Sequence, residues 1–348
     1  MKKIFAMILS VVMIASLTAC GSKETPAASA PAASVPAASV PATSTNQNDL
    51  KWPNETITIY CGYSAGGSSD LLCRYMANAL QKELGVSVIV ENVPGSNSWQ
   101  LWNSMIQTTA KDGNHLCLVN TGILTGKYDP TNPREYGMSD FEMLASQVID
   151  YEGAAIRINE DRFNDMESFI AYAQENPVFI SGTSGYFSGD KTIATYFNDN
   201  YGTQIEHVPV DGAGDQRTMF LAGDTDILFG NVSDLTASGN GSEWKIVATF
   251  SEERTPFTPD VPTLSELNLG DYIGYSVRGF AYADGVDEAI VEKMQQAMLN
   301  VSSNDAEYLA QLEAMGSQVQ VMVGDEWTAA LEKKTTNQLA IMGIEYKG

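Results

Sequence analysis

Histidine is scarce in this sequence, and the cysteines are widely separated. Only two of the 348 residues are histidines, His115 and His207, which leaves little for histidine-based catalysis or histidine-rich metal sites. The four cysteines include no C-x-x-C spacing, which excludes a zinc ribbon and a thioredoxin-type motif. Both histidines fall within strand-like patterns, where core or surface roles are the simpler interpretation. We therefore expect no metal and no other cofactor.

Basic residues are also few, 20 against 43 acidic ones, and the formal net charge is −23. The first 19 residues carry +2 and residues 20–50 carry −1, which leaves −24 on residues 51–348. A body of this charge repels phosphate backbones and anionic lipid surfaces. The composition therefore argues against a nucleic-acid partner and against any membrane contact other than an anchor.

Long apolar runs are absent except at the N-terminus. Lys2 and Lys3 precede an apolar stretch at residues 4–17, about the length of a signal h-region. It ends in Leu-Thr-Ala-Cys, which resembles the bacterial lipobox, whose cysteine is lipidated. We expect a lipoprotein signal peptide at residues 1–19 and a lipid on Cys20. The alternative is a plain secretory signal with a chance cysteine.

A proline-rich repeat follows Cys20. Residues 26–45 repeat a five-residue unit that begins with proline and continues with small side chains. Regular proline blocks a helix, so residues 20–50 are expected to form a semi-extended linker of roughly 3.1 Å per residue. Such a tether fits a body that meets a membrane component, and it equally fits any surface-displayed domain.

Three cysteines remain in the predicted body, Cys61, Cys73 and Cys117. Outside the cytosol they could form one disulfide and leave one free thiol. Three buried thiols are the simpler expectation. The sequence leaves both arrangements open.

From residue 56 onward, strand-like and helix-like runs alternate, which is typical of α/β units on parallel sheets. Two such series, with C-terminal helices left over to return to the first, predict two lobes and a cleft. We expect lobe 1 at residues 51–153 and 276–348, and lobe 2 at residues 154–275. The predicted strands are 56–62, 86–91, 115–120, 178–181, 205–210, 225–229, 244–250 and 318–323, and the predicted helices are 68–84, 96–110, 165–175, 188–200, 212–222, 287–300, 304–315 and 325–342.

The first strand–helix junction, residues 62–70, contains Gly-x-Ser-x-Gly spacing around Ser64. This spacing is the same as in the nucleophile elbow of α/β-hydrolases. The hydrolase fold, however, needs strands before the elbow, and only the linker precedes the strand at 56–62. An anion cradle is the better interpretation, because glycines let the backbone approach a ligand and N–H groups at a helix start favour a carboxylate. An ordinary N-cap by Ser68 is the plain alternative. The candidate ligand-binding residues of this loop are Tyr63, Ser64, Ala65, Gly66, Gly67, Ser68 and Asp70.

The second junction, residues 181–191, is rich in glycine and hydroxyl groups and opens another helix. Ser188 and Lys191 form the S-x-x-K pattern of penicillin-binding enzymes, but no K-T-G follows and no S-D-N lies at useful spacing. We expect a second half-site for an anion here. Its candidate residues are Thr183, Ser184, Gly185 and Ser188.

A third junction places Asp211 and Asp215 at the start of a predicted helix. Either carboxylate could pair with a ligand amine, or could complement the helix dipole. Further hydrogen-bonding candidates at strand ends are Asn120, Thr121 and Asn231.

Seven stretches between residues 52 and 348 together carry a family pattern. They read ITIYCGYSAGGSSDLLCRYMANALQKELG, VIVENVPGS, KDGNHLCLVNTG, GTSGYFSG, HVPVDGAGD, FLAGDTDILFGN and PDVPTLSELN. In this order they resemble the Bug/TctC family, the extracytoplasmic solute receptors of tripartite tricarboxylate transporters. The resemblance implies a type II periplasmic-binding-protein fold, α/β, with two lobes joined by a hinge and a ligand cleft between them. It also implies carboxylate ligands held by backbone amides and hydroxyls of the first and second loops, often through bridging waters and without an arginine clamp.

The sequence departs from the family at three places near the expected cleft. After Pro-Gly at 94–95 the family usually has small residues and glycines, whereas Ser-Asn-Ser-Trp follows here. Phe187 stands where the second loop commonly has glycine, and Val-Asp at 210–211 replaces the usual tyrosine–lysine pair. The extra aromatic and acidic groups favour a ligand with an amine or an apolar body.

We therefore expect a lipid-anchored solute-binding receptor that closes its lobes on a small carboxylate-bearing or amino-acid-like solute. Membrane permease subunits would take the solute from the closed form. We expect no enzymatic reaction. The alternatives are a receptor of the same fold that feeds a signalling protein, and a serine hydrolase that uses Ser64.

Overall fold

Three parallel strands form the first part of the molecule, at the places that the alternating pattern predicts. The computed structural model describes residues 51–183, 186–236 and 239–347, so Cys20, the linker, Ser184 and Gly185 lie outside the described residues. Strand β1 (Ile57–Cys61) pairs with β2 (Val88–Asn92) on one side and with β3 (His115–Val119) on the other.

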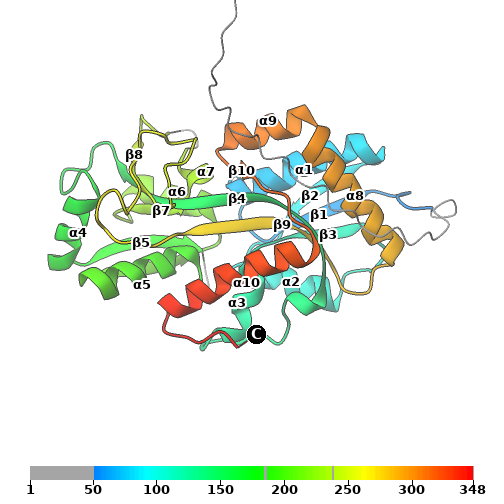
Figure 1. Ribbon diagram of the computed structural model, residues 1–348, viewed down its shortest axis with the longest axis horizontal. Helices are drawn as coiled ribbons and strands as arrows, with labels where there is room; N and C mark the ends of the chain where they lie inside the picture. Colours follow the sequence, from blue (N-terminus) through cyan, green and yellow to red (C-terminus); the bar gives the residue numbers. More distant parts are fainter. Residues whose placement is uncertain (1–50, 184–185, 237–238, 348) are drawn as a thin grey trace, which may run out of the picture. The chain divides into compact units, whose positions relative to one another are not determined.

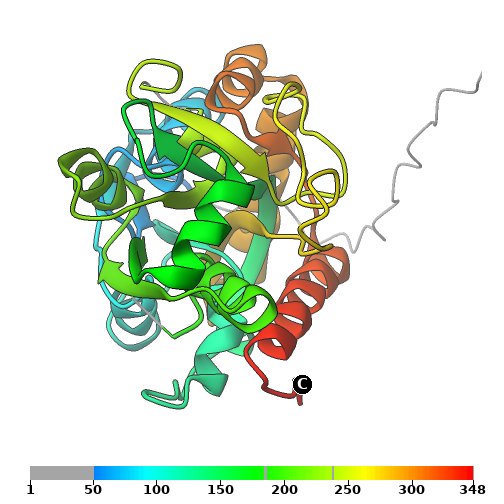
Figure 2. The same ribbon diagram turned by 90° about the vertical axis from the view of Figure 1, so that its left-hand side faces the viewer.

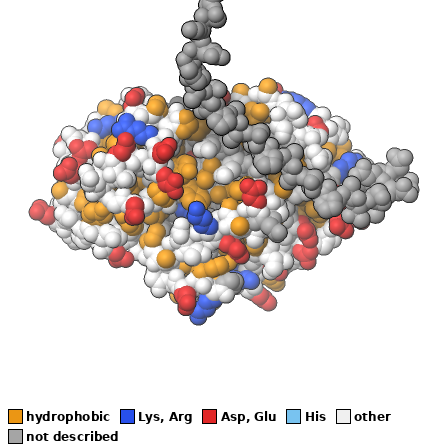
Figure 3. All heavy atoms as spheres, viewed as in Figure 1, with side chains coloured by type: hydrophobic (Ala, Val, Ile, Leu, Met, Phe, Trp, Pro, Cys, Tyr) orange, Lys and Arg blue, Asp and Glu red, His pale blue; other side chains and the backbone are white. Residues whose placement is uncertain are grey.

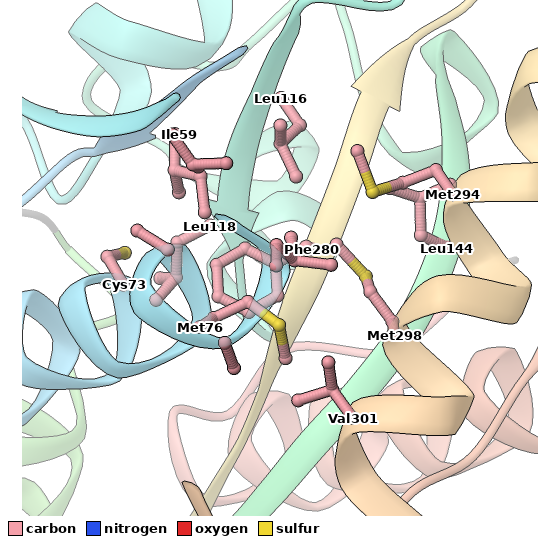
Figure 4. Close-up of a cluster of buried hydrophobic side chains, with 14 of the residues drawn as sticks. Ile59, Cys73, Met76, Leu116, Leu118, Leu144, Phe280, Met294, Met298 and Val301 are labelled. Carbon is pink, nitrogen blue, oxygen red and sulfur yellow. The ribbon is translucent and has the colours of Figure 1, made fainter. Parts of the chain in front are cut away.

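Helix α1 (Ser68–Leu84) follows β1 directly and confirms the predicted helix at 68–84. It ends at Gly85, whose φ of 70° is left-handed, a conformation that glycine adopts without steric cost. Its buried face packs with α8 (Glu288–Asn304) and α9 (Ala306–Met315), which return to the sheet from far along the chain. Figure 4 shows these side chains filling the space between α1, α8 and the strands.

Two long strands, β4 (Phe141–Arg157) and β9 (Tyr275–Ala283), were not predicted from the sequence. They pair antiparallel with each other, and β9 also pairs antiparallel with β3. The expected parallel pairing is confirmed for β2-β1-β3 and for β5 (Val178–Thr183) with β6 (Ile205–Val210), but it is wrong for β9 and β4, which are antiparallel to their neighbours and make the eight-stranded sheet mixed.

Strand β4 passes from lobe 1 into lobe 2. Its first part, to Tyr151, pairs with β9, and its last part, from Glu152, pairs with β7 (Leu228–Asn231) and β8 (Trp244–Thr249). Figure 1 shows β4 and β9 running side by side across the middle of this body. The two lobes are thus connected through one continuous strand.

Lobe 2 contains the parallel pair of β5 (Val178–Thr183) and β6 (Ile205–Val210), with a separate hydrophobic core rich in phenylalanine. Its helix α5 (Gly189–Tyr201) contacts α10 (Gly324–Ile341), a helix that also packs on β4 and β9, and Figure 2 shows α10 alongside lobe 2. The remaining elements are α2 (Trp99–Gln107), α3 (Gly122–Thr125), η1 (Gly126–Tyr128), η2 (Met138–Asp140), α4 (Met166–Glu175), α6 (Ala213–Ala222), α7 (Val232–Leu235) and β10 (Gln318–Val319).

Acidic side chains are spread over the face drawn in Figure 3 and do not gather in one patch. Cys61, Cys73 and Cys117 are free and buried, in agreement with the simpler expectation of three buried thiols. Among the helices described, none combines the length and the apolar character needed to cross a bilayer.

Candidate ligand-binding site

A cavity of about 110 Å³ lies where both lobes meet the long strands. A cavity of roughly 150 Å³ accommodates benzene, so the size suits a small molecule and excludes a peptide or an oligosaccharide. Of the predicted ligand-binding residues, eight line it: Tyr63, Ser64, Gly67, Ser68, Asn120, Thr121, Thr183 and Asn231.

Five other candidates do not line the cavity: Ala65, Gly66, Asp70, Ser188 and Asp211. The Asp70 carboxylate is buried, where it accepts hydrogen bonds from Gly66 N at 3.0 Å and from Arg74 and Asn92. Asp211 contributes its backbone carbonyl, which accepts a hydrogen bond from Ser64 N at 3.4 Å.

The N-terminus of α1 already carries a carboxylate of the protein. Asp234 of α7 accepts hydrogen bonds from Ser68 N and from Ser68 Oγ, both at 2.8 Å. Gly67 occupies the N-cap position, so the predicted alternative of an N-cap by Ser68 is wrong. The first loop therefore offers fewer free amides to a ligand than the sequence suggested, because Asp70 and Asp234 use two of them.

Arg278 of β9 lines the cavity and is 1% exposed. Its guanidinium forms an ion pair with Asp150 of β4 and donates a hydrogen bond of 2.6 Å to Ser68 Oγ. Burial raises the pKa of Asp150 to about 6, although Arg278 and Ser233 oppose this. Asp150 is therefore ionised at neutral pH, and most of the guanidinium charge is compensated inside the protein.

Lys334 of α10 also lines the cavity and is 5% exposed. Its Nζ lies 4.9 Å from the centroid of the Tyr275 ring. Across the part of the chain that the structure describes, the ammonium has neither a hydrogen bond nor an ion pair within 4.0 Å. Burial lowers the pKa of Lys334, and the nearby Glu152 opposes this.

Two buried carboxyl groups face the same end of the cavity. Glu152 of β4 accepts a hydrogen bond of 3.1 Å from the Tyr272 hydroxyl, and Asp190 of α5 accepts one of 3.1 Å from Gln216 Nε2. Burial, with the charge of Glu152 as the second cause, raises the pKa of Asp190 to about 7. Asp190 is therefore partly protonated at neutral pH.

The arrangement around the two candidate nucleophiles does not match a serine hydrolase. The Ser64 hydroxyl donates to Asp215 Oδ2 at 2.6 Å, across from lobe 1 to α6. Ser188 is the N-cap of α5 and accepts from Lys191 N at 3.2 Å; its hydroxyl lies 3.5 Å from His207 Nε2 but is only 1% exposed. Neither serine combines an accessible hydroxyl with a histidine partner, which nucleophilic catalysis of that type needs.

The segment that departs from the family pattern has a special backbone. Ser96, Asn97 and Ser98 have φ values of 52°, 52° and 71°, the left-handed region that favours glycine. This conformation explains why glycines are usual there. It also presents the Asn97 side chain to the cavity, where it accepts a hydrogen bond of 2.9 Å from the Tyr63 hydroxyl.

Five charged residues of the site were missed from the sequence: Glu152, Asp190, Asp234, Arg278 and Lys334. Of these, only Asp190 lies within one of the loop motifs, the second junction at residues 181–191. One signal was present for Lys334, because residues 327, 331, 334 and 338 follow helical spacing and place a lysine on the buried stripe with Trp327 and Leu331. Elsewhere in the described ranges, no group of three histidine, cysteine or acidic side chains is arranged to hold a metal ion.

Comparison with known proteins identifies the family. The model of the tripartite tricarboxylate transporter family receptor, TctC, matches residues 72–341. The chain belongs to this family. A Cupriavidus necator relative, "UPF0065 protein in gbd 5'region", is 29% identical over 257 residues, which cover 71% of this chain and 74% of the relative.

The TctC receptor fold recurs in solved structures. "R. palustris Rpa4515 with adipate" has a TM-score of 0.76 at 18% identity and covers 84% of this chain and 99% of its own. MatC from Rhodopseudomonas palustris, solved with bound malate, has a TM-score of 0.74 at 19% identity and covers 83% and 99%. The fold is the predicted two-lobed α/β fold of periplasmic binding proteins.

Proposed function

We propose that this TctC receptor is a lipid-anchored extracytoplasmic protein that binds a small carboxylate-bearing solute in the cavity and delivers it to a membrane permease. The observation that carries the proposal is the cavity itself. It is small, it is lined by polar groups from both lobes, and it contains a buried ammonium that has no hydrogen-bond or ion-pair partner among the described residues. A small anion supplies what that arrangement lacks.

Contacts across the cleft support closure around the solute. Ser64 and Ser68 of lobe 1 bond to Asp215 and Asp234 of lobe 2, and Arg217 donates to the Gly66 carbonyl at 3.4 Å. These bonds stabilise the closed form, which a permease could distinguish from an open one. Adipate and malate, the molecules bound in two structures of the same fold, are both small carboxylates.

A thermal-shift screen of the purified chain tests solute binding. Mono-, di- and tricarboxylates and amino acids are added one at a time, because a ligand at 100 times its Kd adds about 2.7 kcal/mol of stability. We expect a rise in Tm of several degrees with one carboxylate class. If no compound raises Tm and mass spectrometry of the denatured protein finds no carried-over small molecule, the receptor proposal fails.

Lipid anchoring needs its own experiment. Metabolic labelling of cells with a radioactive fatty acid is expected to label the full chain and to leave Cys20→Ala unlabelled. Labelling of both, or of neither, would contradict an anchor at Cys20.

A further inference from the structure

We propose that the Lys334 ammonium is the positive charge that binds the carboxylate of the solute, an assignment that rests on the proposed function. The family pattern implied recognition by backbone amides and hydroxyls without a cationic clamp. This chain differs, because two cations line its cavity and one of them, Lys334, has no anionic partner within 4.0 Å in the ranges 51–183, 186–236 and 239–347.

The Lys334 ammonium has no hydrogen-bond acceptor among the residues that the structure describes. An ammonium carries three N–H donors, and the face of the Tyr275 ring attracts its charge but accepts no conventional hydrogen bond. A charged group on a side chain this deeply buried is unfavourable without hydrogen bonds, and groups of this kind cluster at functional sites. Because the side chain lines the cavity, the missing partner has access to it.

Arg278, the other cation on the cavity wall, already has partners within the protein. Arg278 is compensated by Asp150, and its Nη1 donates to Ser68. The N-terminus of α1 beside it is occupied by Asp234. The end of the cavity near Arg278 therefore offers a solute little uncompensated positive charge. The group left to bind the carboxylate of the solute is the Lys334 ammonium.

Glu152 is the acidic residue whose charge acts on Lys334, so it is the candidate for a structural partner. Its carboxylate has no ion-pair contact with Lys334 and instead accepts a hydrogen bond from Tyr272. The space at Gly189 and Gly274 is also filled by Glu152, since a Cβ at either glycine would lie within 2.5 Å of a Glu152 oxygen. Glu152 is thus held by β4 and its neighbours beside Lys334, and the ammonium remains available.

Helix α10, which carries Lys334, contacts elements of both lobes, so an anion bound to Lys334 can affect how the lobes close. The helix contacts β4, β9 and α3, and also α5 of lobe 2. Gln338 Nε2 donates to Thr192 Oγ1 of α5 at 3.0 Å and to the carbonyl of Phe187, just before α5, at 2.8 Å. An anion on Lys334 therefore touches a helix that both lobes share. Its binding is expected to favour the arrangement in which α5 and α10 stay together.

The test uses Lys334→Met, a change of similar length that removes the charge, with Lys333→Met as the matched control on the exposed side of the same helix. Binding of the carboxylate that stabilises the wild type most in the screen is measured by calorimetry, and the Tm is measured without ligand. We expect at least tenfold weaker binding for K334M, wild-type binding for K333M, and a ligand-free Tm of K334M equal to or above that of the wild type.

Glu152→Gln separates a ligand contact from a structural pair. Removing the negative charge beside Lys334 is expected to tighten carboxylate binding several-fold. Unchanged affinity in K334M would overturn the assignment. So would a fall in ligand-free Tm for both K334M and E152Q, since that pattern belongs to a structural Lys334–Glu152 pair. If the wild type binds no carboxylate at all, the proposed function fails first.

Discussion

Arg278 and Lys334 are both buried cations on the wall of one cavity, but their surroundings differ: Arg278 has an ion-pair partner, and Lys334 has an aromatic ring. Arg278 comes from the central strand β9, and Asp150, Ser68 and Ser69 surround its guanidinium. Lys334 comes from α10, where its ammonium faces an aromatic ring and the cavity. The charge of Arg278 is therefore compensated by residues of the chain itself and does not need a ligand.

The difference follows from the elements that carry the two residues. The first part of β4, to Tyr151, pairs with β9, with Asp150 opposite Ser276 and Arg278 opposite Val148. This pairing holds Asp150 and Arg278 close together as soon as the sheet forms. Helix α10 packs over the sheet through Trp327 and Leu331, and no acidic residue of the sheet comes within ion-pair distance of Lys334. Buried charge can thus serve stability or recognition, depending on whether its partner is internal.

The largest expected effect comes from breaking the compensated pair. Arg278→Met leaves Asp150 buried without a counter-charge, and removing one partner of a buried ion pair costs about 3–5 kcal/mol. Urea denaturation followed by circular dichroism measures this loss. Combining it with Asp150→Asn should restore part of the stability, because no lone charge remains. If the free energy of unfolding of R278M lay within about 1 kcal/mol of the wild-type value, Arg278 would not be a structural cation.

A second prediction uses pH to examine the acids near Lys334. The pKa of Asp190 is about 7 in the folded chain and 3.8 in the reference state, so the folded state holds a proton that unfolding releases between these values. This contribution to stability is complete below about pH 4 and is lost as the pH rises through 7. The groups around Asp190 are Glu152 of β4, Gln216 of α6, Thr183 of β5 and His207 of β6.

Asp190→Asn cannot ionise, so its Tm is expected to exceed that of the wild type by several degrees more at pH 8 than at pH 5. Thermal denaturation in matched buffers checks this. His207 acts in the opposite direction, because burial lowers its pKa to about 4 and its contribution is lost as the pH falls below 6.5. Since both chains contain His207, its effect cancels in the difference. An equal Tm difference at both pH values would contradict the raised pKa.

The smallest expected effect concerns Asp234, which accepts hydrogen bonds at the N-terminus of α1. Asp234→Ala removes the acceptor for Ser68 N and Ser68 Oγ and should cost about 1–2 kcal/mol, as loss of a helix-terminal acceptor does. Asp234→Asn keeps one oxygen and should cost less. The exposed Asp224 provides a control, since Asp224→Ala should leave the free energy of unfolding unchanged. A loss as large as that of R278M would mean that α1 depends on Asp234 more than its geometry indicates.

Much of the fold could be predicted from local pattern. The strand at 57–61 and the helix that ends at Gly85 combine alternation, helical spacing and a glycine stop, all of which act over a few residues. Strand β4 carries no such signal. It is buried on both faces over much of its length and contains Gln147, Asp150 and Glu152 in the interior, so neither alternation nor hydrophobicity marks it.

The site divides in the same way. Loop residues at strand ends, such as Ser64 after β1 and Asn120 after β3, were predictable because parallel strands bring their carboxyl ends together. Arg278 was not, because a single arginine in an apolar strand becomes a cavity residue only through antiparallel pairing of β9 with β3 and β4. Long-range pairing of this kind leaves no mark on the local sequence.

The place of α10 in the chain has a consequence for when the receptor becomes functional. Lys334 and Gln338 follow every other cavity residue in the sequence. During synthesis from the N-terminus, the residues of β1 to β9 are complete before the chain reaches Lys334. If Lys334 binds the carboxylate as proposed, a chain that ends before α10 lacks the charge that the solute needs, so solute affinity is complete only once the C-terminal helix has packed onto the rest of the protein.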